Sequence, residues 1–99
     1  MEGWIKVHRR ITNWEWYHDL PTFKLFMHCL FIANVEDKKW KGILIKRGQF
    51  VRSLQNLATE CGLTMRQVRT AIEHLESTQS LTRSKIRKTQ VFTVVEYDT

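Results

Sequence analysis

Residues 54–73 read LQNLATECGLTMRQVRTAIE, and the pattern of this stretch decides the fold of the chain. Apolar residues recur at helical spacing on both sides of a central glycine: Leu57 and Cys61 before it, and Val68, Ala71, Ile72 and Leu75 after it. The glycine, Gly62, stands where a sharp turn favours a residue that adopts positive φ without strain. The stretch therefore predicts two helices that meet at a tight turn, a helix-turn-helix.

The residues around the turn support the same motif. Ala58 is small at a position where the two helices would cross closely, and Leu63 is placed to fill the angle between them. Thr64 and Gln67 form the pattern Thr-x-x-Gln, which satisfies free amide groups at the start of the second helix. Ser53 can cap the first helix in a similar way. This combination is typical of helix-turn-helix motifs that bind DNA.

The second helix has a polar face that could contact DNA. At about 100° per residue, the apolar side takes in Met65, while Glu73 and Ser77 fall on the opposite side. Recognition helices present their amino-terminal outward residues to base edges, where Arg suits guanine and Gln suits adenine. Glu73 could accept from cytosine, although a solvated position is the simpler interpretation. The predicted DNA-facing residues here are Thr64, Arg66, Gln67, Arg69, Thr70 and His74.

A basic hairpin is predicted after the second helix, which should end near Ser77. Residues 81–86 and 91–97 read as two strands, and no acidic residue lies between Glu76 and Glu96. The basic residues of the hairpin are Arg83, Lys85, Arg87 and Lys88. They could contact phosphates beside the major groove, or they could form a solvated edge that discourages strand pairing. The tip, residues 87–89, lacks the usual glycine or asparagine, so its turn type stays open.

A helix-turn-helix followed by such a hairpin is a winged helix. The predicted fold class is therefore α+β, mostly α, with a small antiparallel β-sheet. Residues 1–99 should form a single domain, because no repeat, linker or low-complexity tract interrupts them. A loose helical spacing runs through residues 3–17, and residues 34–42 read as a polar, solvated loop. Residues 43–45 and 50–51 favour strands.

A further helix is predicted over residues 23–33, after the capping residue Asp19 and a proline at position 21. This segment is apolar nearly all round, which places it at the centre of the domain. Before it lies an aromatic cluster of Trp14, Trp16 and Tyr17. The rings could stack on bases, pack over the core, or mediate self-association.

Composition narrows the class of protein. The net charge of +6 favours a polyanionic partner, most simply nucleic acid. Cys29 and Cys61 lie in apolar helical patterns and form no Cys-x-x-Cys pair. We therefore expect the protein to be located in the reducing cytoplasm. No apolar run approaches the roughly 20 residues that span a membrane, and residues 1–4 lack the pattern of a signal peptide.

The sequence contains no constellation that predicts catalysis, a metal site or a cofactor. His28 and Cys29 are adjacent, so on a helix they would point about 100° apart and make a poor nucleophile and base. The other histidines, at positions 8, 18 and 74, show no metal-ligand spacing with each other or with Cys61. A binding protein without enzymatic activity is expected.

Four segments also carry a resemblance to a known family: GWIKVHR at 3–9, WEWY at 14–17, IKRGQ at 45–49 and VRTA at 68–71. With these motifs the chain resembles the amino-terminal domain of phage replisome organiser proteins, which is itself similar to the winged helix of DnaD-like primosomal proteins. The resemblance implies binding near a replication origin, self-association and recruitment of helicase-loading proteins. Such proteins usually continue into a second domain, so residues 1–99 would be the amino-terminal part of a longer protein or a stand-alone module.

Two alternatives stay open at this stage. A winged-helix transcriptional regulator shares the architecture. A protein–protein adaptor of the primosome would use the same fold, with Trp14, Trp16 and Tyr17 as its contact surface.

Overall fold

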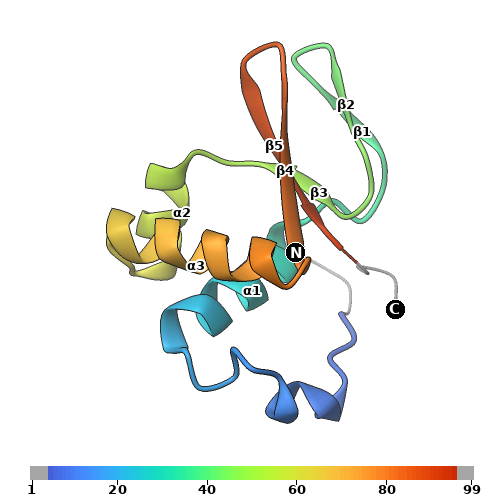
Figure 1. Cartoon of the computed structure of the whole chain (residues 1–99). Coiled ribbons are helices and arrows are strands. Elements are labelled where there is room, and N and C mark those ends of the chain that lie inside the picture. Colours follow the sequence, from blue (N-terminus) through green and yellow to red (C-terminus); the bar gives the residue numbers. More distant parts are fainter. Residues whose placement is uncertain (1–4, 96–99) are drawn as a thin grey trace.

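The computed structural model describes residues 5–95. The helices are η1 (Arg9–Asn13, a 3-10 helix), α1 (Leu20–Ile32), α2 (Leu54–Cys61) and α3 (Met65–Ser77). The strands are β1 (Lys38–Trp40), β2 (Ile43–Ile45), β3 (Gln49–Val51), β4 (Leu81–Ile86) and β5 (Thr89–Val94). The three α-helices pack together at one end, and two hairpins project from the other end (Figure 1).

The predicted helix-turn-helix is confirmed, and its turn is closed by local hydrogen bonds. Gly62 has a φ of 69° in the left-handed region, and the amide of Leu63 donates to the carbonyl of Ala58 at 2.9 Å. This is the Schellman arrangement, which needs a residue free to adopt positive φ. The amide of Gln67 donates to the hydroxyl of Thr64, and the Gln67 side chain accepts from the amide of Thr64, so the capping box is complete.

The core lies between the buried faces of the helices and one face of a sheet. The buried side of α3 consists of Val68, Ala71, Ile72 and Leu75, as the helical spacing predicted. Leu25 and Cys29 of α1 meet this core, and both are fully buried. From the sheet side, the rings of Phe50 and Phe92 stack with centroids 5.2 Å apart. Burying side chains of this size stabilises a fold by about 1.5–3 kcal/mol each.

A three-stranded antiparallel sheet of order β3-β5-β4 completes the winged helix. β3 precedes the helix-turn-helix and β4 follows it, and both pair with β5. In this register Phe92 of β5 lies opposite Phe50 of β3 on one side and Arg83 of β4 on the other. The hairpin of β4 and β5 is the wing. Its turn consists of Arg87 and Lys88, with φ values of 51° and 68°, between the paired residues Ile86 and Thr89. Two positive φ values in a two-residue turn correspond to type I′.

The structure corrects the prediction of a loop over residues 34–42, while the predicted exposure to solvent is confirmed for residues 35–42. Residues 38–40 form β1, which pairs with β2 so that Trp40 lies opposite Ile43. The intervening Lys41 and Gly42 have φ values of 47° and 79°, so they make a second tight hairpin turn. Lysine is unfavourable in strands, and the segment becomes a strand only through its pairing with β2.

Three other boundaries differ from the prediction. In the amino-terminal segment only η1 is helical. Residues 5–8 are irregular, and residues 3–4 lie outside the described part. Helix α1 begins at Leu20, and it is not buried all round, since Leu20 is 75% and Phe31 43% exposed. Its inner side alone faces α2, α3 and the sheet. Strand β5 runs from Thr89 to Val94, and Tyr97 lies outside the described residues.

Candidate nucleic-acid interface

The outward face of α3 presents polar side chains that make no hydrogen bond or ion pair with other described residues. Arg66, Arg69 and Thr70 are exposed, and no described residue forms a side-chain hydrogen bond or ion pair with them. Their position follows from the packing of the opposite side, because the hydrophobic residues of α3 are used by the core. Glu73 is exposed on the same face and adds one negative charge. This face can offer hydrogen-bond donors and positive charge to a ligand.

Two predicted contact residues already serve the cap of α3. The Oε1 atom of Gln67 accepts from the amide of Thr64 at 3.0 Å, and the Thr64 hydroxyl accepts from the amide of Gln67 at 3.1 Å. A bidentate contact with adenine needs both the oxygen and the nitrogen of a glutamine amide. In this arrangement the cap occupies one of the two acceptor sites of Gln67 Oε1, and the NH₂ group is not used by the cap.

His74 faces the start of α1. Its ring stacks on Trp16 with centroids 4.3 Å apart and an interplanar angle of 7°. The Nδ1 atom lies 2.9 Å from the Thr22 hydroxyl and 3.2 Å from a carboxylate oxygen of Asp19. Threonine, histidine and aspartate meet here, but both partners face the same ring nitrogen, so the histidine cannot relay a proton between them. The contacts of His74 hold α3 to α1.

The wing carries the second group of predicted residues. Lys85, Arg87 and Lys88 are exposed, and none of them has a side-chain partner among residues 5–95. Arg83 differs, because its Nε atom lies 3.0 Å from a carboxylate oxygen of Glu76 at the end of α3. That ion pair fixes the base of the wing to α3 and leaves the positive charge of the tip uncompensated.

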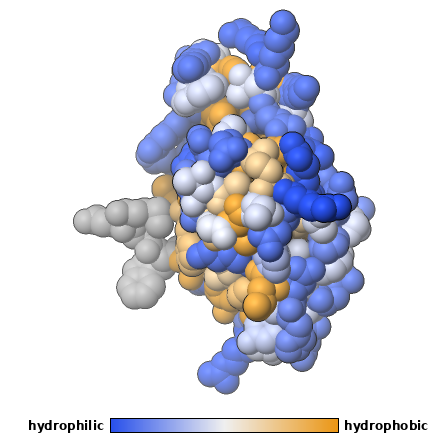
Figure 2. Space-filling model, turned by 90° about the vertical axis from the view of Figure 1, so that its left-hand side faces the viewer, coloured by the Kyte–Doolittle hydropathy of each residue, from blue (hydrophilic) through white to orange (hydrophobic). Residues whose placement is uncertain are grey.

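The structure thus forms two polar surfaces from the predicted residues. One lies on α3, and the other lies at the tip of the wing, whose six-residue strand β4 spans about 20 Å (Figure 1). At the end of the molecule where the hairpin tips lie, hydrophilic residues surround smaller apolar patches (Figure 2). Two separate surfaces suit an extended ligand better than a small molecule.

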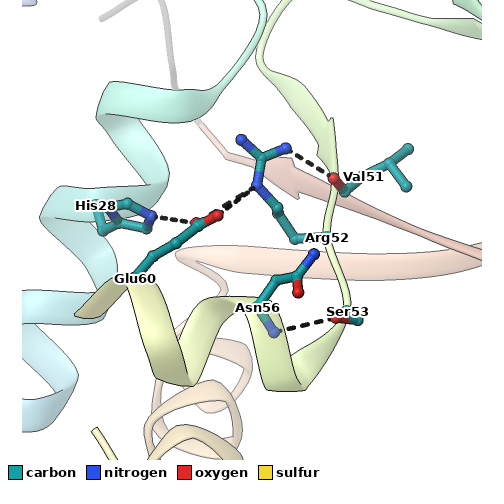
Figure 3. Close-up of polar contacts among 6 residues, drawn as sticks. All are labelled: His28, Val51, Arg52, Ser53, Asn56 and Glu60. Atoms are coloured by element: carbon teal, nitrogen blue, oxygen red, sulfur yellow. Dashed lines mark hydrogen bonds and ion pairs between the residues drawn. The ribbon is translucent and has the colours of Figure 1, made fainter. Parts of the chain in front are cut away.

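An ion-pair cluster that the sequence did not predict holds the helix-turn-helix in place (Figure 3). The carboxylate of Glu60 in α2 accepts from Nε2 of His28 in α1 at 2.7 Å and from Nε of Arg52 at 3.2 Å. Arg52 follows β3 and also donates to the carbonyl of Val51 at 3.0 Å. The hydrogen bond from His28 chiefly lowers the pKa of Glu60, and the charge of Arg52 adds to this shift. The cluster therefore joins α1, α2 and β3 through one carboxylate.

The aromatic cluster packs against the chain itself. Trp14 contacts Phe26 with ring centroids 4.8 Å apart, and Nε1 of Trp16 donates to the Thr78 hydroxyl at 3.1 Å. Tyr17 meets the ring of Phe23 edge-on at 5.4 Å. All three rings are half-buried, and the two tryptophans pack against the core. These contacts confirm the core-packing interpretation for the two tryptophans, and self-association through the cluster stays a prediction.

The cysteines belong to the core. Burial raises the pKa of the Cys29 and Cys61 thiols, so neither is a ready nucleophile. Among residues 5–95, no three or more His, Cys, Asp or Glu side chains come together as a possible metal site. The described helices are too short, or too polar, to cross a membrane.

Comparison of the chain with protein-family models, with curated proteins and with solved structures finds no match.

Proposed function

We propose that this protein is a double-stranded DNA-binding winged-helix domain without enzymatic activity. The observation that carries the proposal is the outward face of α3, where Arg66, Arg69 and Thr70 are exposed and have no described partner. In helix-turn-helix proteins the corresponding helix enters the major groove and presents its amino-terminal residues to base edges. The wing adds positive charge that suits the phosphate backbone.

We further propose that the domain serves replication initiation, as part of a phage-type replisome organiser protein in the cytoplasm. This step depends on the sequence resemblance in residues 3–9, 14–17, 45–49 and 68–71. A transcriptional regulator is the alternative within DNA binding. An adaptor that self-associates or contacts helicase-loading proteins is the alternative outside it.

Site selection from random duplex DNA tests the role of α3. The variant Arg66→Ala should keep its melting temperature, because Arg66 is exposed and supports no described contact. Its affinity for the selected site should fall by about 1–3 kcal/mol, and its affinity for random duplex should fall less. Arg9→Ala is the matched control, since Arg9 is an exposed arginine in η1. It removes the same charge outside the proposed interface.

Each outcome separates the candidates. Equal losses on selected and random DNA would make Arg66 a phosphate contact and would leave the proposal of base recognition without support. Failure of the protein to bind any duplex at low salt would reject DNA binding and favour the adaptor. Self-association of the protein that does not change with salt concentration would strengthen that conclusion.

A further inference from the structure

The hairpin of β1 and β2 is a second basic projection beside the wing. It carries Lys38, Lys39 and Lys41, all of them exposed and without an ion-pair partner in the described part of the chain. No acidic residue follows Asp37 until Glu60. The Asp37 carboxylate accepts from the amide of Arg47, so it lies at the base of this hairpin. The positive charge of the hairpin tip is therefore uncompensated.

The two hairpins are held side by side by a small core of their own. Ile43 and Ile45 of β2 are buried against Val91 of β5, and Val51 of β3 packs against the same group. The tips also approach each other, because a Cβ atom built on Gly42 would lie 3.4 Å from Nη1 of Arg87. Both tips lie at the same end of the molecule (Figures 1 and 2). Their relative position is thus fixed by packing and does not depend on a ligand.

The backbone of both tips is unfavourable for the residues that occupy it. Four non-glycine residues among those described have positive φ, and three of them are the basic tip residues Lys41, Arg87 and Lys88. Such positions favour Asn and Gly, and a bulky side chain there costs of order 1 kcal/mol. Like charges also gather where the tips approach. The hairpin sequence therefore lowers stability at the place where it concentrates positive charge.

We infer that the β1–β2 hairpin is a second DNA-contacting wing, which binds the phosphate backbone through Lys38, Lys39 and Lys41 next to the wing of β4 and β5. This inference rests on the proposed function and extends it to a surface that the sequence analysis predicted to be solvated.

The position of Trp40 supports the inference. The ring is 39% exposed at the tip, and Nζ of Lys41 lies 4.8 Å from its centroid. An exposed aromatic ring between lysines can contact sugars or bases while the lysines neutralise phosphates.

The test is a salt titration of duplex binding with charge-matched variants. One variant replaces Lys38, Lys39 and Lys41 by Gln. The control variant replaces Lys6, Arg9 and Arg10 by Gln, and these residues are exposed at the opposite end of the molecule (Figure 1). Both variants lose the same charge. For the hairpin variant, the slope of log K against log salt concentration should fall by about 0.9 for each phosphate that the variant no longer neutralises. The control should keep a slope close to that of the parent protein.

A second readout does not depend on net charge. Duplex DNA should quench part of the tryptophan emission of the parent protein, and Trp40→Phe should remove that part. A hairpin variant that keeps both the parental slope and the parental quenching would overturn the inference, as would an equal loss of slope in the control. If the parent protein binds no duplex at all, the proposed function itself fails. Binding by the parent with no effect of the hairpin variant rejects this inference alone.

Discussion

The helix-turn-helix and the two hairpin tips follow opposite rules. Between Ser53 and Ser77 every local choice agrees with the fold: both helices have side-chain caps, and glycine occupies the left-handed position. At the tips, Lys41, Arg87 and Lys88 occupy left-handed positions that suit asparagine or glycine. Local conflict of this kind is expected at functional sites, where stability is given up for binding. The comparison separates a scaffold optimised for folding from tips that carry charge.

The largest expected effect concerns the scaffold. Gly62→Val should lower the free energy of unfolding by about 1–3 kcal/mol, because a β-branched residue is strained at positive φ. A Cβ atom at this position meets no atom within 4 Å, so the loss would come from the backbone alone. Thermal unfolding measures it. An unchanged melting temperature would mean that the turn tolerates a side chain and that the scaffold is not optimised there.

The tip should respond in the opposite direction. The double change Arg87→Asn and Lys88→Gly supplies the residues that a type I′ turn favours. It should raise the free energy of unfolding by about 1 kcal/mol, which corresponds to roughly 4–8 °C in a domain of this size. Calorimetry of parent and variant checks the sign. A decrease in stability would show that the parental residues suit their turn and would remove the contrast between tip and scaffold.

A smaller effect is expected at the Glu60 cluster, and it depends on pH. The pKa of Glu60 is lower in the folded state, so its ionised form stabilises the fold above the ordinary carboxyl pKa, and this stabilisation is lost as the pH falls through the folded-state value. Glu60→Gln should therefore lower stability by up to about 1 kcal/mol at pH 7, since the side chain is partly solvated. The difference from the parent should vanish in strong acid.

Glu15→Gln is the matched control, because Glu15 is exposed and has no side-chain partner in residues 5–95. Chemical denaturation at several pH values compares the variants. A Glu60→Gln effect equal to that of the control would mean that the contacts with His28 and Arg52 contribute nothing measurable. A larger loss that is independent of pH would mean that ionisation of Glu60 is not its source.

Local patterns explain why part of the fold could be predicted. Gly62, the Thr64–Gln67 box and the apolar side of α3 report on residues close in sequence, and all three match the structure. The strand at 38–40 was missed because it exists by pairing with β2 and by the packing of Ile43 against the wing. A window rich in lysine carries no sign of either contact.

The site could be predicted less completely for a similar reason. Helical geometry placed Arg66 and Thr70 on the outward face of α3 and Arg69 on its flank, and all three are exposed. It could not reveal that His74 stacks on Trp16, far away in the sequence, or that Arg83 pairs with Glu76. It also gave no sign of the Glu60 cluster, which joins three separate segments. Such contacts depend on how elements pack and leave no periodic signal.

The most direct test of the proposed DNA binding is a salt titration of the tip variant Arg87→Asn/Lys88→Gly on random duplex. Since this variant is expected to fold more stably than the parent protein, unfolding cannot account for weaker binding. The parent should bind duplex with a steep salt slope, and the variant should bind more weakly, with a slope smaller by about 0.9 for each phosphate left without its basic partner. Equal slopes and affinities, or no duplex binding by the parent at low salt, would contradict the account.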